Sequence, residues 1–336
     1  MTLAVERTTR ASRIGALVAL LLVAALVALP WAGDAGLMRV VIEFVALLVL
    51  AQMWNLLAGY AGLVSIGQQA YVGLGGYALI VLADDLGVNP FLAVPLAGLI
   101  ATGFALATAA LVFRFRDAYF AVGTWAVAEV YRLLVANTTA LGRGTGRTLK
   151  AVFPLARETR ELVTYAIALA IGVAALVAVY LYLRSRRGLG LMAVRDSEPA
   201  SESLGVDVYR TKLAVYLVAA FGTGTTGALI YLNLLRISPD AAFSINWTAN
   251  TVFSVVIGGL GTLEGPIVGT LVFFLLRELL ADYGSWYMIL LGTLAVLAMI
   301  RYPQGLWGLV AERWDVNLFP VQRRVPDGAD PSAPGR

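Results

Sequence analysis

The chain of 336 residues contains no cysteine and no histidine. Their absence excludes disulfide bonds, thiolate chemistry, metal sites built from these residues, and general acids or bases that depend on histidine. Charge is also scarce, because Asp, Glu, Lys and Arg make up only 14% of the chain, against about 25% in soluble domains. No stretch matches the P-loop motif G-x-x-x-x-G-K-[ST] of ATPases. We therefore expect neither an enzyme nor a bound metal or cofactor.

Hydrophobic residues make up 60% of the chain, and the mean hydropathy is +0.80. Seven apolar runs are long enough to cross about 30 Å of hydrocarbon, at residues 14–32, 37–58, 91–113, 162–183, 213–235, 264–281 and 285–301. Glycine, charge or shortness interrupts three weaker segments, at residues 66–83, 118–136 and 249–261. The sequence predicts an all-α polytopic membrane protein of about ten membrane segments, including broken or short helices. We interpret the first run as a retained span.

The distribution of charge predicts the orientation. Residues 1–310 are expected to form one membrane-embedded domain, followed by a cytoplasmic, disordered tail at 311–336 that is rich in proline, glycine and charge. Ten segments place both termini on one side, and most loop arginines fall on that side, so the positive-inside rule predicts cytoplasmic termini. The loop at 137–161 is an exception, with five basic residues. The net charge of +4 is modest and lies in loops, so nucleic-acid binding is not expected.

Glycine and polar residues break the helical pattern between residues 55 and 77. Non-helical backbone inside a membrane is tolerated where it is buried in protein or lines a wet cavity. The segment is therefore a candidate part of a solute path, and tight helix packing is the alternative. Glu129 is also a candidate path residue, because an ionisable residue within a membrane span indicates a functional site. An ion pair with Arg132 that only fixes helix packing is an equally good explanation of its presence. The candidate path residues are Asn55, Gly59, Gly62, Ser65, Gly67, Gln68, Gln69 and Glu129.

Two other patterns predict helix contacts. Gly261, Gly265 and Gly269 recur every four residues, which predicts one helical face that packs closely on a neighbour. The apolar piece before them is short, so a half-helix and a turn are expected. Arg39 and Glu43 are four residues apart near the start of the second span, where they are expected to form an interfacial pair.

A polar stretch at residues 184–212 separates two long apolar runs. Asp196 or Ser197 can cap a helix there, Glu198 and Pro199 suit a first turn, and Gly205 suits its end. We predict a short helix of about two turns outside the bilayer, on which a soluble partner docks. An ordinary solvated loop is the alternative.

Four stretches, taken in order, resemble the LivM-type permease subunit of branched-chain amino acid ABC importers. They read NLLAGYAGLVSIGQQAYVGLGGYALI, RFRDAYFAVGTWAVAEVYRLLVAN, RRGLGLMAVRDSEPASESLGVDVYRTKLAVYLVAAFGTGTTGAL and VIGGLGTLEGPIVGTLV. The resemblance covers residues 40–310. In that family the polar stretch is the segment that docks on an ATPase subunit, which implies a coupling role for Arg195, Asp196, Ser197, Glu198, Glu202, Leu204 and Gly205.

The resemblance implies import of leucine, isoleucine and valine across a prokaryotic plasma membrane. Its implied partners are a homologous LivH-type permease, two ABC ATPase subunits that use ATP, an extracytoplasmic solute-binding protein and membrane lipid. A urea or short-amide ABC importer is the first alternative, because its permease resembles this chain closely. An ion-coupled secondary transporter is the second, although Glu129 is the one convincing buried carboxylate for ion coupling.

Overall fold

The computed structural model describes residues 10–32, 35–280, 286–302, 304–314 and 318–319. Within these residues the only strands are β1 (Arg147–Thr148) and β2 (Arg236–Ile237), which pair antiparallel. A π-helical turn η1 (Val81–Asp85) and a 3₁₀ turn η2 (Thr139–Leu141) join longer elements. The α-helices are α1 (Arg10–Ala32), α2 (Ala35–Ala61), α3 (Gln69–Ile80), α4 (Pro90–Val112), α5 (Asp117–Asn137), α6 (Arg157–Arg184), α7 (Arg186–Asp196), α8 (Glu198–Ser203), α9 (Val208–Leu234), α10 (Pro239–Ala242), α11 (Ile245–Gly258), α12 (Gly265–Leu279), α13 (Trp286–Arg301) and α14 (Gly305–Trp314).

The predicted all-α polytopic fold is confirmed. Seven segments of the described chain are long and apolar enough to cross a membrane: Ile14–Trp31, Ala35–Ala61, Pro90–Val112, Asp117–Asn137, Arg157–Arg184, Val208–Leu234 and Gly292–Arg313. Helices α3, α11 and α12 have only 12, 14 and 15 residues, whereas a full span needs about 20. The run at 264–281, which reads as a complete span in the sequence, is therefore a shorter helix.

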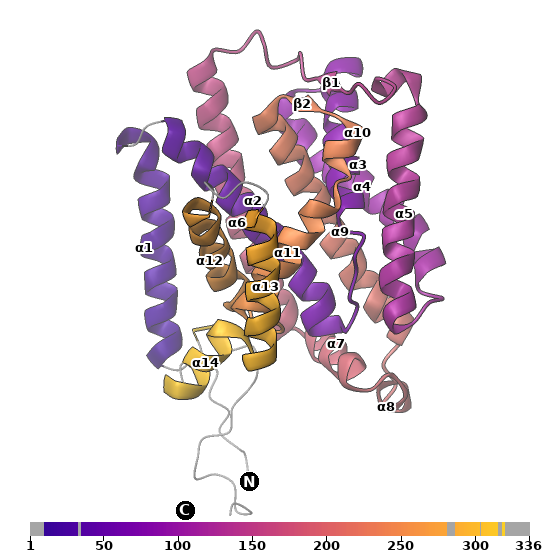
Figure 1. The fold of residues 1–336 in the computed structure, drawn as a ribbon, viewed down its shortest axis with the longest axis vertical. Helices are drawn as coiled ribbons and strands as arrows, with labels where there is room; N and C mark the ends of the chain where they lie inside the picture. The colour runs from indigo at the N-terminus through magenta and orange to yellow at the C-terminus, as the bar shows by residue number, and fades with distance from the viewer. Residues whose placement is uncertain (1–9, 33–34, 281–285, 303, 315–317, 320–336) are drawn as a thin grey trace, which may run out of the picture.

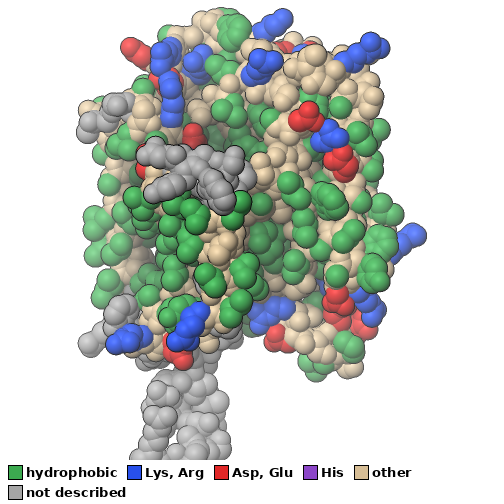
Figure 2. Space-filling view, viewed as in Figure 1, with side chains coloured by type: hydrophobic (Ala, Val, Ile, Leu, Met, Phe, Trp, Pro, Cys, Tyr) green, Lys and Arg blue, Asp and Glu red, His purple; other side chains and the backbone are tan. Residues whose placement is uncertain are grey.

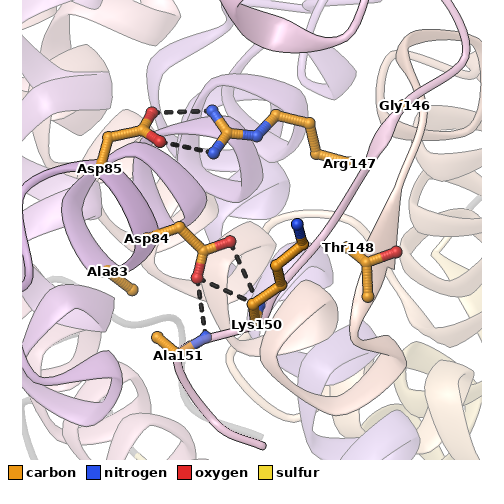
Figure 3. A pocket seen from close by; sticks show the side chains of 8 residues that line it. All are labelled: Ala83, Asp84, Asp85, Gly146, Arg147, Thr148, Lys150 and Ala151. Atoms are coloured by element: carbon orange, nitrogen blue, oxygen red, sulfur yellow. Dashed lines mark hydrogen bonds and ion pairs between the residues drawn. The ribbon is translucent and has the colours of Figure 1, made fainter.

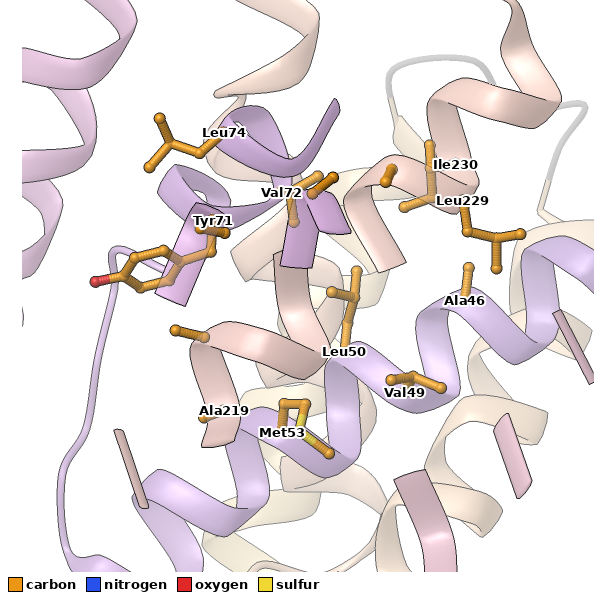
Figure 4. Close-up of a cluster of buried hydrophobic side chains, with 14 of the residues drawn as sticks. Ala46, Val49, Leu50, Met53, Tyr71, Val72, Leu74, Ala219, Leu229 and Ile230 are labelled. Atoms are coloured by element: carbon orange, nitrogen blue, oxygen red, sulfur yellow. The ribbon is translucent and has the colours of Figure 1, made fainter. Parts of the chain in front are cut away.

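Helices α2, α3 and α9 form the centre of the molecule, and Figure 4 shows their apolar side chains meeting. All twelve residues of α3 are buried, which is the expected position for a helix that is apolar on every side. Helix α1 lies at the edge (Figure 1), and most of its described side chains are exposed. Its apolar surface therefore suits contact with lipid.

Small residues allow α3 and α9 to cross closely. A Cβ atom built on Gly75 would lie 1.9 Å from the carbonyl oxygen of Gly224, and one on Gly227 would lie 2.2 Å from that of Val72. Neither position has room for a larger side chain. The glycines of α3 are thus packing residues as well as helix-weakening ones.

The two ends of the helical bundle differ (Figure 1). Helices α7, α8 and α14 lie at one end, which we call the α7–α8 end, together with the start of α1. The strands and η2 lie at the other, the β1–β2 end. Helix α14 continues to Trp314, so the predicted tail at 311–336 begins as helix, and residues 315–317 and 320–336 lie outside the described part.

The predicted pairing of Arg39 with Glu43 is wrong. The guanidinium of Arg39 lies 2.9 Å from the carboxylate of Glu161 on α6, and Glu43 lies 2.9 Å from Arg277 on α12. Arg39 and Glu43 thus each pair with a charged residue of a neighbouring helix and not with each other. A sequence taken alone shows i,i+4 spacing but not which helices will stand beside it.

Candidate functional site

The chain is not helical between α2 and α3, at residues 62–68, so the predicted break is confirmed. The amide of Ile66 donates a hydrogen bond to the side-chain oxygen of Thr124 on α5, at 3.1 Å. A Cβ atom on Gly67 would lie 2.2 Å from the carbonyl oxygen of Thr124. Glycine is required for this close approach, which gives part of the broken segment a hydrogen-bond partner inside the protein.

Three polar side chains predicted for the solute path lie in this break or at the residue that follows it. Ser65, Gln68 and Gln69 are 3%, 4% and 1% exposed. The Gln68 amide donates to the hydroxyl of Thr223 on α9 at 2.9 Å, and the oxygen of the Gln69 amide accepts from the hydroxyl of Thr248 on α11. Gln69 lines a cavity, described below, and the other two are packed inside the protein. The path itself stays a prediction.

Asn55, another predicted path residue, binds the turn between α11 and α12. Its Oδ1 accepts from the amide of Gly261 and its Nδ2 donates to the carbonyl oxygen of Thr262, both at 2.8 Å. One helical turn earlier, Gln52 Nε2 donates to the carbonyl oxygen of Leu263 at 2.7 Å. Both side chains are fully buried. Two amides of α2 therefore hold the tip of the α11–α12 hairpin.

The predicted half-helix and turn are present as α11 and the segment at 259–264, but the single glycine face is wrong. Gly261 lies in the turn with φ +77°, because α12 begins only at Gly265. It packs against Gly59 of α2, where a Cβ on Gly59 would lie 2.6 Å from the amide nitrogen of Gly261. Gly269 faces α11, since its Cβ would lie 1.7 Å from the carbonyl oxygen of Ser254.

A cavity of about 310 Å³ opens between α3, α5 and the α10–α11 region. Glu129 and Arg132 of α5 form the predicted pair, with three hydrogen bonds of 2.6–3.0 Å. Asp240 of α10, which the sequence analysis did not connect with them, accepts a fourth from Arg132 at 2.5 Å. Arg132 thus bridges two carboxylates on two elements at the cavity wall.

The polar stretch forms two helices at the α7–α8 end (Figure 1). The predicted short helix is α8, where the hydroxyl of Ser197 accepts from the amide of Ala200 at 3.4 Å and Pro199 lies in the first turn. Gly205, with φ +82°, follows it. Leu204 is 81% exposed, so an apolar side chain stands free beside α8.

Helix α7 was not predicted, because Gly188 and Gly190 disfavour a helix. The spacing of its buried residues, Gly188, Leu191 and Val194, is the signal that was available. At its end, Arg195 donates to the carbonyl oxygen of Gly59 in the last turn of α2, at 2.9 Å. The proposed coupling stretch therefore touches the same end of α2 that holds the α11–α12 hairpin.

Acidic and basic residues also pair at the β1–β2 end, around a cavity of about 650 Å³ (Figure 3). Asp85 forms two hydrogen bonds of 2.6 and 2.7 Å with Arg147, and these bonds lower the pKa of Asp85 below its ordinary 3.8. Asp84 accepts from the backbone amides of Lys150 and Ala151. Acidic residues of η1 thus bind part of the basic loop at 137–161. This is the loop whose basic residues do not follow the positive-inside rule.

Long apolar helices, short buried helices and a polar helical segment at one end define a multi-pass membrane protein. A family model described as branched-chain amino acid transport system / permease component matches residues 36–299. The chain belongs to this family. No solved structure matches it.

Curated relatives agree with this assignment. The chain is 28% identical to the high-affinity branched-chain amino acid transport system permease protein LivM of Salmonella typhimurium, and also to LivM of Escherichia coli. Each alignment covers 86% of this chain and 74% of the relative. The fructose import permease protein FruG of Bifidobacterium longum is 28% identical, over 36% of this chain and 38% of its own length.

Proposed function

We propose that the chain is the membrane permease subunit of an ABC importer that carries leucine, isoleucine and valine. The family match over residues 36–299 is the observation on which this rests. The alignment with LivM over 86% of the chain supports the same substrates. The chain acts without an ATPase site of its own, so separate subunits supply the energy of ATP.

The partners are a second, homologous permease of the LivH type, two ABC ATPase subunits and an extracytoplasmic solute-binding protein. The α7–α8 segment is the docking site for an ATPase. This docking role is supported by Leu204, whose exposed apolar side chain lies beside charged side chains of α8. Such a combination suits a mainly polar interface that has one apolar anchor residue. The contact of Arg195 with Gly59 links this segment to α2.

The α7–α8 end faces the cytoplasm of a prokaryotic cell, with both chain termini on that side. Because the chain has no cysteine, a single introduced cysteine reports its side without background. We expect Ala200→Cys to react with a membrane-impermeant maleimide only in inverted vesicles. Thr145→Cys, in the loop at the β1–β2 end, is expected to react only in right-side-out cells. Labelling of Ala200→Cys from outside intact cells contradicts this orientation.

The function is tested by reconstituting the chain with its three kinds of partner in proteoliposomes and measuring uptake of radiolabelled L-leucine. We expect uptake that requires ATP on the α7–α8 side and that excess isoleucine or valine inhibits. Uptake of urea but not of leucine assigns the chain to the short-amide importers instead. Leucine uptake driven by an ion gradient without ATP contradicts the ABC mechanism.

A further inference from the structure

The cavity between α3, α5 and the α10–α11 region has features that helix packing alone does not require. Figure 2 shows acidic and basic side chains gathered over α10 and α5, below the charged upper edge. The side chains of Glu129, Arg132 and Asp240 are 46%, 27% and 81% exposed. Charged groups that face lipid are costly, so this side of the molecule must face water or another protein.

The charges at the cavity do not cancel. The guanidinium of Arg132 carries one positive charge, and the carboxylates of Glu129 and Asp240 carry two negative charges. The three groups together therefore have a net charge of −1. Arg132 binds Glu129 through three hydrogen bonds but Asp240 through one. Asp240, the most exposed of the three, therefore keeps acceptor capacity for a cationic ligand such as an ammonium group.

Groups suited to an anion lie at another part of the same cavity wall. Gln69 is 99% buried, and its amide oxygen is occupied by Thr248. Among the described residues no group accepts a hydrogen bond from its Nε2, which leaves that donor for a ligand. Ser244 and Ile245, also at the wall, begin α11. The amides of Asn246 and Trp247 already donate to the hydroxyl and the carbonyl oxygen of Ser244. The amide of Ile245 and the helix dipole are therefore what favour negative charge there.

The rest of the wall is apolar. Trp125, Phe243 and Ile245 line the cavity, and Trp125 is 49% exposed. The volume of about 310 Å³ is at the small end of the range for ligand pockets, about 300–1,000 Å³. The cavity thus combines a cation-binding part, an anion-binding part and an apolar wall at the scale of one small molecule.

We propose that this cavity binds the zwitterion of the transported amino acid. Asp240, held in place by Arg132, accepts hydrogen bonds from the ammonium group. Gln69 Nε2 and the amide of Ile245 donate to the carboxylate, and Trp125, Phe243 and Ile245 contact the aliphatic side chain. This inference rests on the proposed function, and it adds a binding site and the role of each residue.

The test uses the full chain in lipid nanodiscs and measures ligand binding by saturation-transfer difference NMR, which detects weak binding. The probes are L-leucine and 4-methylpentanoate, which is leucine without its amino group. We expect wild-type protein to prefer leucine. Because a hydrogen bond to a charged group accounts for about tenfold or more in affinity, Asp240→Asn should weaken leucine binding at least about tenfold. The affinity for 4-methylpentanoate should not change.

Asp85→Asn is the matched control, because it also removes a carboxylate that binds an arginine, yet Asp85 lines the other cavity. It should leave leucine binding unchanged. Trp125→Ala should weaken the binding of leucine several-fold more than that of L-alanine. Equal binding of leucine and 4-methylpentanoate by wild-type protein, or unaltered leucine affinity in Asp240→Asn, overturns the site.

ATP-driven uptake separates the two proposals. If the reconstituted importer takes up leucine and Asp240→Asn binds it normally, the proposed function stands and this site is wrong. If the wild-type importer takes up no leucine, the function itself is wrong, and the site falls with it.

Discussion

Asn55 joins two parts of the chain that are more than 200 residues apart, since its amide bonds both Gly261 and Thr262. Asn55→Ala leaves a partly buried N–H and a partly buried carbonyl without this partner, and a loss of this kind costs up to about 1–3 kcal/mol for a buried group. We expect a clear fall in the melting temperature of the detergent-solubilised protein. Asn137→Ala, which removes a bond to Leu133 within one exposed turn, is the control and should change stability by less than about 0.5 kcal/mol. Equal melting temperatures for the two variants contradict the structural role of Asn55.

The ion pair of Asp85 with Arg147 predicts a pH dependence at the β1–β2 end. The pKa of Asp85 is lower in the folded chain than its ordinary 3.8, so the pair stabilises the fold above the unfolded-state pKa of about 4. This stability is lost as the pH falls through the lowered folded-state pKa. Hydrogen exchange of residues 146–151, corrected for intrinsic rates, should show constant protection from pH 7 to about 5 and a loss below about 4. The acid loss should be smaller in Asp85→Asn, and a loss already at pH 6 contradicts the assignment.

At the scale of elements, the sequence predicted those features that depend on residues close together in the chain. Apolar length identified the long helices, and the capping pattern from Ser197 to Gly205 identified α8. Contacts between distant segments were not predictable in this way. The glycines at 261, 265 and 269 have helical spacing, but the side chain of Asn55 holds Gly261 in a turn before α12 begins. The bridge from Arg132 to Asp240 spans 108 positions, and no local pattern marks it.

The close contact of α11 and α12 gives an element-scale prediction. Gly269→Leu places a side chain where even a Cβ atom would lie 1.7 Å from the carbonyl oxygen of Ser254. The two helices must separate, and overpacking of this kind costs about 1–3 kcal/mol or more. We expect less folded protein in the membrane fraction and a lower melting temperature. Gly103→Leu, where a Cβ meets no atom within 4 Å, should behave as wild type. Wild-type stability of Gly269→Leu rules out this packing.

At the scale of the whole molecule, the α7–α8 segment lies between two long helices, α6 and α9, and Arg195 ties it to α2. A partner that displaces this segment therefore acts on three helices at once. Two of them, α2 and α9, form the buried centre with α3. Helix α3 begins at Gln69, which lines the cavity proposed for the amino acid. The fold thus provides a continuous chain of contacts from the α7–α8 segment to that cavity.

Ser201→Pro tests this coupling most directly. Ser201 is buried, and its amide donates to the carbonyl oxygen of Ser197 at 3.1 Å. Proline removes that bond and disrupts the helix at a cost of about 3 kcal/mol, whereas Ser201→Ala keeps the helix and serves as the control. Leucine accumulated and ATP hydrolysed are measured in the same proteoliposomes. We predict that Ser201→Pro still hydrolyses ATP but accumulates leucine at least about tenfold less per ATP than Ser201→Ala. An equal ratio of leucine to ATP in the two variants contradicts a coupling role for the α7–α8 segment.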